Sequence, residues 1–489
     1  LPNILVLVLD TARAMNISCY GYERTTTPNL DSIASEGVIY TNAVSNAPWT
    51  LPAHASLFTG QHPFQHGAHA KNLYLDPDLP TLAEILTESG YETSIISNNG
   101  WLSGGFGVCR GFEHNYKMWK LFQTESNIVD PYREYVKDKN IARQPWNLLP
   151  FGKEVLEQGN PVRDLLNVAY GAYRNDEYHH SGDRITKITK GRIRSDQPFF
   201  IVANYLEPHL KYCPPEPHRS KFLPEGHSWE DAQAITQDTY EVQFGDKSLS
   251  ADDRQILEGL YNGELAHVDQ FVGEVYAELK RTDQLDETLL IVLGDHGENI
   301  GNSGMLGHNA SIAEPVLRVP LVIRPPGGDD REVSHYVQLS DIYQTVLTAT
   351  DCTPPDTNEV PEPLSYNILA QDLGGRPDVA LSQYAGLQLD QSRIEQDYPD
   401  TDISWYDSQL QSVISGTHKL IKREVGDDKL YDLSTDPEEH RNLIEEIPDR
   451  AEKLYSILSS LSGGAVVADG IEHEMDRDIK NRLQDLGYL

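Results

Sequence analysis

The segment Asn3-Ile4-Leu5-Val6-Leu7-Val8-Leu9-Asp10 is an unbroken apolar run that ends at a carboxylate. A short run without a polar face is typical of a parallel strand that is buried on both sides. Residues 288–295, Thr-Leu-Leu-Ile-Val-Leu-Gly-Asp, show the same pattern and also end at an aspartate. These two segments predict the central strands of an α/β fold with a mostly parallel sheet.

Strand-like and helix-like runs alternate outward from these two segments. Further strands are predicted at residues 38–44, 92–97, 197–206 and 319–324, and helices at residues 28–36, 79–87 and 252–281, with another helix after Thr50. Such alternation is typical of a layered fold in which helices cover both faces of the sheet.

Two regions depart from this alternation. Residues 114–183 are irregular and rich in aromatic side chains, so we expect a variable insertion that covers one end of the sheet. Beyond a proline-rich stretch, antiparallel strands are predicted at residues 411–415, 419–423 and 429–433, followed by a helix at residues 449–461. We therefore predict a large domain over residues 1–375 and a small C-terminal α+β subdomain over residues 376–489.

The charge balance of the chain is strongly acidic. Its 489 residues include 40 Lys and Arg against 75 Asp and Glu, which gives a formal net charge of −35. Such a surface repels nucleic acid and anionic lipid, so we expect no nucleic-acid partner. The acidic residues are spread along the chain, which suits a protein kept soluble in concentrated salt. We interpret the source as a halophilic organism, with an ordinary acidic protein as the alternative.

Cysteine spacing and hydropathy bear on the compartment. The four cysteines lie far apart, with neither metal-type nor redox-type spacing. Free thiols favour a reducing interior, so a cytoplasmic protein is expected. No apolar run is long enough to cross a bilayer, and no transmembrane segment is predicted. The sequence does not indicate an oligomeric state.

Polar side chains follow the predicted strands at the points where these strands end. Asp10 follows the first strand, residues 46–54 follow another, and Asp295 and His296 follow a third. In open α/β sheets, function gathers at the carboxyl ends of the strands. Two carboxylates and an imidazole there are a suitable ligand set for a divalent cation.

Thr50 is the most informative residue of this group. A hydroxyl at a helix N-terminus lies where backbone N–H groups and the helix dipole favour an anion. A metal ion held by Asp10, Asp295 and His296 would lower the pKa of that hydroxyl and make it a nucleophile. The alternative is that Thr50 is only a helix cap.

The segment around Thr50 resembles a known signature. Thr50-Leu51-Pro52-Ala53-His54-Ala55-Ser56-Leu57-Phe58-Thr59-Gly60 is similar to the sulfatase signature, in which Cys or Ser precedes x-Pro-Ser-Arg and a later Thr-Gly. The resemblance extends over nearly the whole chain. Its other motifs, in order, are residues 3–10, 27–31 (Thr-Pro-Asn-Leu-Asp), 205–209 (Tyr-Leu-Glu-Pro-His), 294–298 (Gly-Asp-His-Gly-Glu), 318–321 (Arg-Val-Pro-Leu), 430–433 with 436–437, and 486–489.

The resemblance implies an alkaline-phosphatase-like αβα sandwich in residues 1–375, and displacement at sulfur or phosphorus through a covalent enzyme intermediate. It implies one or two divalent metal ions, with Mn, Zn, Ca and Mg all left open. The residues that match metal ligands are Asp10, Thr50, Asp295 and His296, with Thr50 also the nucleophile. His209 matches a leaving-group acid or anion contact, and His308 a basic residue that touches the transferred group. His54 joins the predicted catalytic set, and Asn99 and Lys71 are predicted to contact the substrate.

Several positions depart from the family pattern. Threonine cannot be oxidised to the formylglycine of true sulfatases, and His54 replaces the arginine of the signature. Thr11 stands where a second aspartate is usual, and residues 98–101 (Asn-Asn-Gly-Trp) replace a Lys-Trp-His segment. The basic groups that clamp a sulfate are therefore largely missing, and a threonine nucleophile is typical of phosphodiesterases of the superfamily.

We therefore predict a metal-dependent ester hydrolase that cleaves a phosphate, phosphonate or sulfate ester through Thr50. The expected substrate is a small-molecule, glycan-linked or lipid-linked anionic ester. Three alternatives stay open: a sulfuric ester hydrolase proper, a transferase of a phosphate-containing head group, and an inactive binding protein. A second metal site among His62, His66 and His69 is a further alternative, although loop histidines are mostly structural.

The acidic surface predicts that stability rises with salt concentration, because screening reduces the repulsion between carboxylates in the folded state. The melting temperature should increase from low to multimolar KCl. A curve that stays flat or falls across this series would contradict the halophilic interpretation.

Overall fold

The computed structural model describes residues 1–123, 162–163, 166–167, 181–194, 197–355, 364–373, 375–389, 391–462, 475, 477–486 and 488. Its centre is an eight-stranded sheet of order β11-β2-β10-β7-β1-β6-β4-β5. The strands are, in that order, Arg331–Val333, Val38–Tyr40, Leu321–Arg324, Thr288–Leu293, Asn3–Leu9, Phe199–Tyr205, Glu92–Ser97 and His114–Lys117. Within this sheet β10 alone runs against its neighbours, so the predicted mostly parallel sheet is confirmed.

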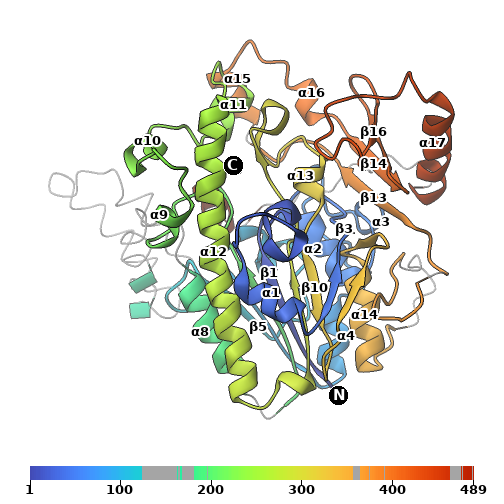
Figure 1. Cartoon of the computed structure of the whole chain (residues 1–489). Helices are drawn as coiled ribbons and strands as arrows, with labels where there is room; N and C mark the ends of the chain where they lie inside the picture. Colours follow the sequence, from blue (N-terminus) through green and yellow to red (C-terminus); the bar gives the residue numbers. More distant parts are fainter. Residues whose placement is uncertain are drawn as a thin grey trace.

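Helices cover both faces of the sheet, and β1 shows why its sequence has no polar face. Ile4, Val6 and Val8 pack into one hydrophobic core, whereas Leu5, Leu7 and Leu9 pack into the other. The first core includes residues of α2 (Thr50–Thr59), α4 (Leu82–Glu88) and α14 (Asp341–Thr350), and the second those of α1 (Pro28–Ala34), α8 (Gly182–Arg192) and α12 (Ala251–Arg281). Figure 1 shows α12 running along one side of this αβα sandwich.

Some element bounds differ from the sequence-based prediction. The single strand predicted at residues 38–44 is two strands, β2 and β3 (Ala43–Val44), and β3 pairs with β12 (Val337–Gln338) in a separate sheet. The helix predicted at residues 79–87 begins three residues later, because the Thr81 hydroxyl accepts the Glu84 N–H and caps α4. Most of the insertion predicted at residues 114–183 lies outside the described residues.

A small antiparallel sheet forms the C-terminal subdomain (Figure 1). It consists of β13 (Val379–Tyr384), β14 (Leu410–Ser415), β15 (His418–Arg423) and β16 (Lys429–Asp432), with α17 (Pro448–Ser462) packed on one face. The last three strands and the helix were predicted, but β13 was missed. Further on, α18 (Arg477–Asp485) packs Ile479 and Leu483 into the core of the large domain. The predicted boundary between residues 375 and 376 stays a prediction.

A buried ionic cluster joins the subdomain to the large domain. Lys419 of β15 is fully buried, and its Nζ lies 2.9 Å from Glu314 Oε1 and 2.8 Å from Glu439 Oε1. Glu314 begins α13 (Glu314–Leu317). The carbonyls of Pro315 and Val316 in this helix accept the backbone N–H groups of Glu298 and Gly297. The cluster therefore holds the helix that supports the chain just after His296.

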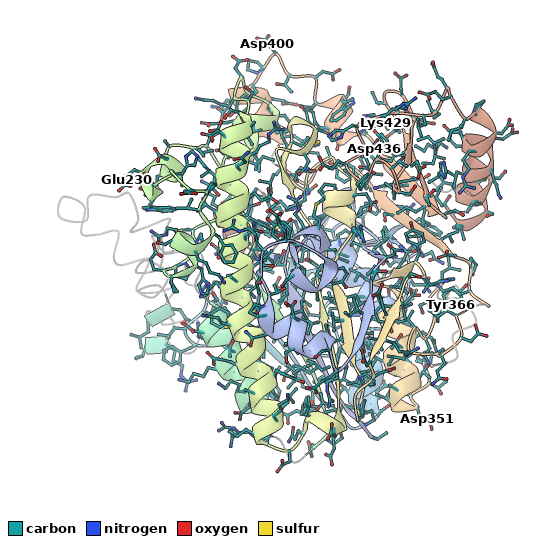
Figure 2. All side chains as sticks on the ribbon, in the orientation of Figure 1. Glu230, Asp351, Tyr366, Asp400, Lys429 and Asp436 are labelled. Atoms are coloured by element: carbon teal, nitrogen blue, oxygen red, sulfur yellow. The ribbon has the colours of Figure 1, made fainter. Side chains whose placement is uncertain are left out.

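Carboxylates face the solvent around the molecule. Glu230, Asp351 and Asp400 are exposed and lie at its outline in Figure 2. No helix in the described part of the chain is both long and apolar enough to cross a membrane.

Replacing the buried cation should destabilise the protein strongly. Lys419→Met leaves Glu314 and Glu439 buried without a partner charge, which costs roughly 3–5 kcal/mol of unfolding free energy. Lys422→Met is the matched control, because Lys422 lies on the same strand and is exposed. Calorimetry should show a large fall in melting temperature for the first variant and little change for the second. Equal melting temperatures would contradict a structural role for the cluster.

Candidate active site

Two neighbouring parallel strands bring the first group of polar side chains together. Asp10 follows β1, whereas Asp295 and His296 follow β7, which pairs with β1. One ligand atom from each of the three residues lies within 4.8 Å of the others. His296 Nε2 is 3.8 Å from Asp10 Oδ1 and 3.6 Å from Asp295 Oδ2. All three side chains are buried.

The electrostatics of this group favour a cation. Burial raises the pKa of both aspartates, and the neighbouring Asp10 charge raises that of Asp295 further. Burial lowers the pKa of His296, so its imidazole is neutral. Its Nδ1 donates to Gly297 O, which leaves the Nε2 lone pair facing the carboxylates. Among the described residues, Asp10 Oδ1 and Asp295 Oδ2 have no hydrogen-bond partner. Two carboxylate oxygens without a hydrogen-bond partner, facing an imidazole nitrogen, fit a divalent cation.

Thr50 lies beside this group at the start of α2. Its Oγ1 is 3.4 Å from His296 Nε2 and accepts a 3.0 Å hydrogen bond from Asn99 Nδ2. The N-cap residue of α2 is Trp49, and Thr50 is the first residue of the helix. Thr50 was expected just ahead of the helix, whereas in the structure the helix begins one residue earlier and includes it. The Thr50 hydroxyl faces the carboxylate cluster and does not act as an N-cap.

Asn99 connects Thr50, the candidate nucleophile, to Asp10, a candidate metal ligand. Its Nδ2 also donates to Asp10 Oδ2 at 2.8 Å, and its Oδ1 accepts the Trp101 N–H at 3.0 Å. The second bond fixes the orientation of the amide. Asn99 was predicted to contact the substrate, and in this structure it holds Thr50 and Asp10 in place.

His54 lies one helical turn after Thr50 and is fully buried. Its Nδ1 donates to Thr50 O at 2.9 Å and lies 3.6 Å from Asp295 Oδ2. Burial lowers the pKa of His54 to about 4, so the ring is neutral near pH 7. His54 therefore supplies no positive charge where the sulfatase signature has arginine.

The backbone contributes further contacts to Asp295. Thr11 stands in place of the usual second aspartate and has a left-handed backbone with φ of 61°. The N–H groups of Thr11 and His296 both donate to Asp295 Oδ1, at 3.2 and 2.9 Å. The strained conformation of Thr11 thus provides a hydrogen-bond donor. These two donors leave only the second oxygen of Asp295 free for an ion.

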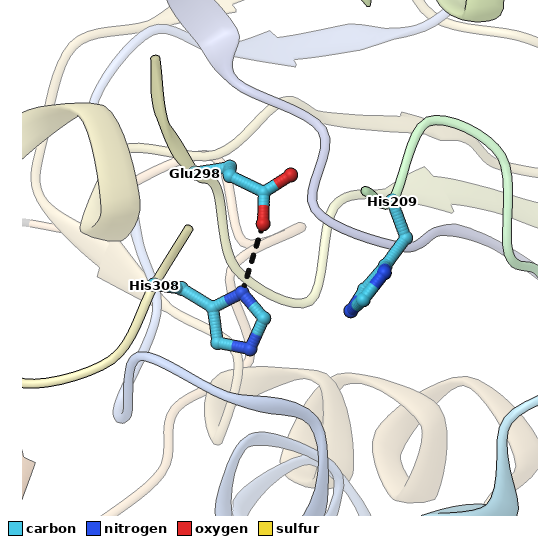
Figure 3. A group of neighbouring side chains, drawn as sticks. All are labelled: His209, Glu298 and His308. Carbon is cyan, nitrogen blue, oxygen red and sulfur yellow. Dashed lines mark hydrogen bonds and ion pairs between the residues drawn. The ribbon is translucent and has the colours of Figure 1, made fainter. Parts of the chain in front are cut away.

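A second group lies next to the first. His209, Glu298 and His308 are buried, and one ligand atom from each lies within 4.8 Å of the others. Figure 3 shows Glu298 bonded to His308, with His209 on the other side of the gap. The rings of His296 and His308 are 4.5 Å apart between centroids. The expected positions of His209 and His308 are therefore close to the carboxylate cluster.

Two residues of this second group received no role from the sequence. Glu298 belongs to the Gly-Asp-His-Gly-Glu motif, which was a usable signal. Tyr488 belongs to the motif at residues 486–489, but this motif indicated no role, because Tyr488 reaches the site only when the chain folds back to it. Its hydroxyl lies 2.8 Å from His209 Nε2 and 3.4 Å from His308 Nε2.

Other predicted residues lie apart from these groups. Lys71 Nζ is 3.9 Å from Asp407 Oδ2, and its described contacts do not include the cluster, so its role in substrate binding stays a prediction. The alternative second metal site predicted at His62, His66 and His69 is not among the ligand groups in the described part of the chain. The three histidines bond to separate partners, namely His62 to Asn46, His66 to Ser56 and His69 to the Lys71 N–H.

A cavity of about 170 Å³ opens beside the second group. Its lining includes His209, His308 and Tyr488, together with the cationic side chains of Lys211 and Arg393. An anionic molecule whose reacting group lies at Thr50 could extend into this space.

Known proteins share this sequence and fold. A family model described as Sulfatase matches residues 2–352. YidJ of Escherichia coli (strain K12), named an uncharacterized sulfatase, is 26% identical over 94% of this chain and 86% of its own. An arylsulfatase of Clostridium perfringens is 22% identical over 94% of this chain and 93% of its own. The crystal structure of a phosphonate monoester hydrolase of Agrobacterium radiobacter has a TM-score of 0.68 at 20% identity, covering 94% of this chain and 95% of that one.

The buried aspartate pair predicts a stability order that reverses with metal. In chelator at pH 8, Asp295→Asn should melt above the wild type, because it removes one of two buried carboxylates. Its new Nδ2 can also donate to His296 Nε2, a hydrogen bond worth about 1 kcal/mol. With saturating Zn²⁺ or Mn²⁺ the wild type should melt above Asp295→Asn, because the ion binds the folded wild type more tightly than it binds the folded variant.

The exposed Asp400→Asn is the matched control and should follow the wild type in both buffers. A wild type that is more stable than Asp295→Asn by the same margin with and without metal would contradict the metal assignment.

Proposed function

The chain belongs to the sulfatase family, and we propose that it hydrolyses a phosphate, phosphonate or sulfate ester through a covalent intermediate on Thr50. One observation carries this proposal. The Thr50 hydroxyl, at the N-terminus of α2, is held by Asn99 beside two buried carboxylates and a neutral imidazole. A buried hydroxyl oriented in this way is suited to attack on an anionic ester.

Each residue of the site has a separate role in the proposed cleavage of the ester. Asp10, Asp295 and His296 would hold a divalent cation, which would supply Lewis acidity that lowers the pKa of the Thr50 hydroxyl and attracts the ester. Asn99 orients Thr50 Oγ1, and His54 binds the carbonyl of the same residue. Thr50 Oγ gives its proton to solvent and forms a bond to phosphorus or sulfur while the bond to the leaving oxygen breaks, and that oxygen takes a proton from solvent. Water then attacks the same centre and breaks its bond to Thr50 Oγ; the hydroxyl of the water stays on the product, and its proton returns to Thr50.

The contacts of His209 bear on its expected role as leaving-group acid. Its Nδ1 lies 2.6 Å from Leu210 O, and its Nε2 lies 2.8 Å from the Tyr488 hydroxyl. Both ring nitrogens therefore have partners within the protein. The hydroxyl next to His209 is that of Tyr488, whose pKa is raised well above its usual value by burial and by nearby carboxylates.

Phosphate or phosphonate esters are the favoured substrates. Threonine does not mature to formylglycine, and the neutral groups of His54 and Asn99 occupy positions where sulfatases have cations. Sulfate esters are the second candidate, because an arylsulfatase is among the relatives. The cavity lining combines Lys211 and Arg393 with Asp238 and Glu298, and Arg393 lies 3.5 Å from Asp238, so the charge of the lining does not distinguish a glycan-linked from a lipid-linked substrate.

The test combines a substrate screen with substitution of the nucleophile. Aryl phosphate, phosphodiester, phosphonate and sulfate esters are assayed with Mn²⁺, Zn²⁺, Mg²⁺ and Ca²⁺. Thr50→Ala should lower turnover at least about 10³-fold, since the nucleophile is lost. Thr50→Ser should retain part of the activity because it keeps the hydroxyl. Mass spectrometry of the quenched enzyme should find the transferred group on Thr50.

Thr59→Ala is the matched control for these variants. Thr59 lies on the same helix and is buried, and its hydroxyl donates to Ala55 O and accepts the Gln61 N–H, away from the carboxylate cluster. It should keep near-normal turnover. Undiminished activity of Thr50→Ala would overturn the proposal, and product formation that requires an added acceptor alcohol would favour a transferase.

A further inference from the structure

We propose that Tyr488 is a positioning residue of the active site, which holds the imidazoles of His209 and His308 where an ester would meet them. Its hydroxyl lies between the two rings, and the helix that precedes it, α18, docks on the loop that carries Asn99. The contacts of Tyr488 carry the inference, and only the use of the two histidines in ester cleavage rests on the proposed function.

One oxygen joins the two imidazoles. The Tyr488 hydroxyl lies 2.8 Å from His209 Nε2 and 3.4 Å from His308 Nε2. It therefore fills the point toward which the two ring nitrogens converge. The centroids of the histidine rings are 5.4 Å apart, and they lie 5.7 and 5.8 Å from that of the Tyr488 ring. The three rings are thus one packed group whose polar atoms meet at a single hydroxyl.

The other nitrogen of each imidazole also has a partner. His209 Nδ1 lies 2.6 Å from Leu210 O, and His308 Nδ1 lies 3.0 Å from Glu298 Oε1. A ring with a partner at both nitrogens loses both contacts when it turns. Tyr488 supplies the second partner of both rings, so without its hydroxyl each imidazole is held on one side only.

The hydroxyl lies where the ester is proposed to react. Tyr488 lines the cavity together with His209 and His308. Burial and nearby carboxylates raise the pKa of Tyr488 well above its usual value, and a hydrogen-bonding contact with the Thr50 side chain offsets part of this rise. Tyr488 is therefore a neutral side chain with a proton to donate, next to the proposed nucleophile.

The helix α18 fixes the position of Tyr488. Ile479 and Leu483 of this helix are buried in the core of the large domain. The Tyr488 N–H donates to Leu483 O at 3.0 Å, which ties the tyrosine to the end of the helix. Its ring packs edge-on against Trp101, with centroids 5.6 Å apart and an angle of 74° between the planes. The backbone and the ring of Tyr488 are therefore both anchored.

The surface on which α18 docks is the loop around Asn99. Arg482 Nε donates to Asn98 O at 3.0 Å. Gly100 leaves room for the helix, because a Cβ there would lie 3.0 Å from Leu483 Cδ2. Asn99, which orients the proposed nucleophile, lies between these two contacts. The same helix therefore supports the nucleophile loop and delivers the hydroxyl that holds the two histidines.

Deleting one oxygen tests the proposal. Tyr488→Phe keeps the ring against Trp101 and removes only the hydroxyl. Because both imidazoles are then held on one side only, kcat should fall roughly 10- to 100-fold, while KM changes by less than about twofold. The assay uses the ester that the wild type cleaves fastest.

Tyr91→Phe is the matched control. Tyr91 is buried like Tyr488, and its hydroxyl donates to Pro2 O at 3.0 Å. Each substitution removes one buried hydrogen bond, so both should lower the melting temperature by similar small amounts. Only Tyr488→Phe should lose turnover, which separates the positioning role from a general loss of stability.

A chemical measurement tests the contact without an assay of turnover. Diethylpyrocarbonate modifies imidazole nitrogens, and the cavity gives it access to His209 and His308. Mass spectrometry of peptides follows the modification of each histidine over time. The rates at these two residues should rise several-fold in Tyr488→Phe and stay at the wild-type level in Tyr91→Phe.

Modification rates that are equal in Tyr488→Phe and the wild type would overturn the proposal, whatever happens to turnover. Turnover that stays at the wild-type level, or a loss that appears only in KM, would also overturn it. Turnover that rises would do the same, because the hydroxyl would then obstruct the site. A wild type that cleaves none of the tested esters contradicts the proposed function, whereas the modification rates still decide whether Tyr488 holds the histidines.

Discussion

The repulsion between two buried carboxylates, Asp10 and Asp295, is the constraint on which the site depends. The parallel pairing of β1 with β7 forces these residues to the same sheet edge. Each carboxylate accepts hydrogen bonds through one of its two oxygens. Asn99 donates to Asp10 Oδ2, and two backbone N–H groups donate to Asp295 Oδ1. The remaining oxygens face a neutral imidazole. This arrangement is costly without a cation, and it becomes a binding site when one is present.

Support for this edge comes from distant parts of the chain. The Lys419 cluster fixes α13, whose carbonyls hold the backbone just after His296. The approach is so close that a Cβ on Gly297 would lie 2.1 Å from Pro315 O, which explains why the motif needs glycine there. The returning C-terminus brings Tyr488 to the two histidines. The C-terminal subdomain is therefore part of the support of the site, because it holds the helix on which the site rests.

Fixed positive charge is scarce around the proposed nucleophile. His54 is neutral because it is buried, and Asn99 contributes an amide. An enzyme that cleaves an anionic ester needs positive charge where negative charge develops in the transition state. Bound cations would supply that charge in place of the missing arginine and lysine. The neutral His54 and Asn99 therefore lie next to the carboxylate cluster of Asp10 and Asp295, where a bound cation would supply this charge.

The sequence alone was enough to predict the central strands, the long helix α12 and the meeting of Asp10 with Asp295 and His296. These features depend on local hydropathy and on the rule that the carboxyl ends of parallel strands share an edge. The structure was needed for the break at residues 41–42, for β13, and for the contacts of Glu298 and Tyr488 with the histidines. Strand partners, burial and histidine tautomers depend on residues far apart in the chain, so no local pattern in the sequence encodes them.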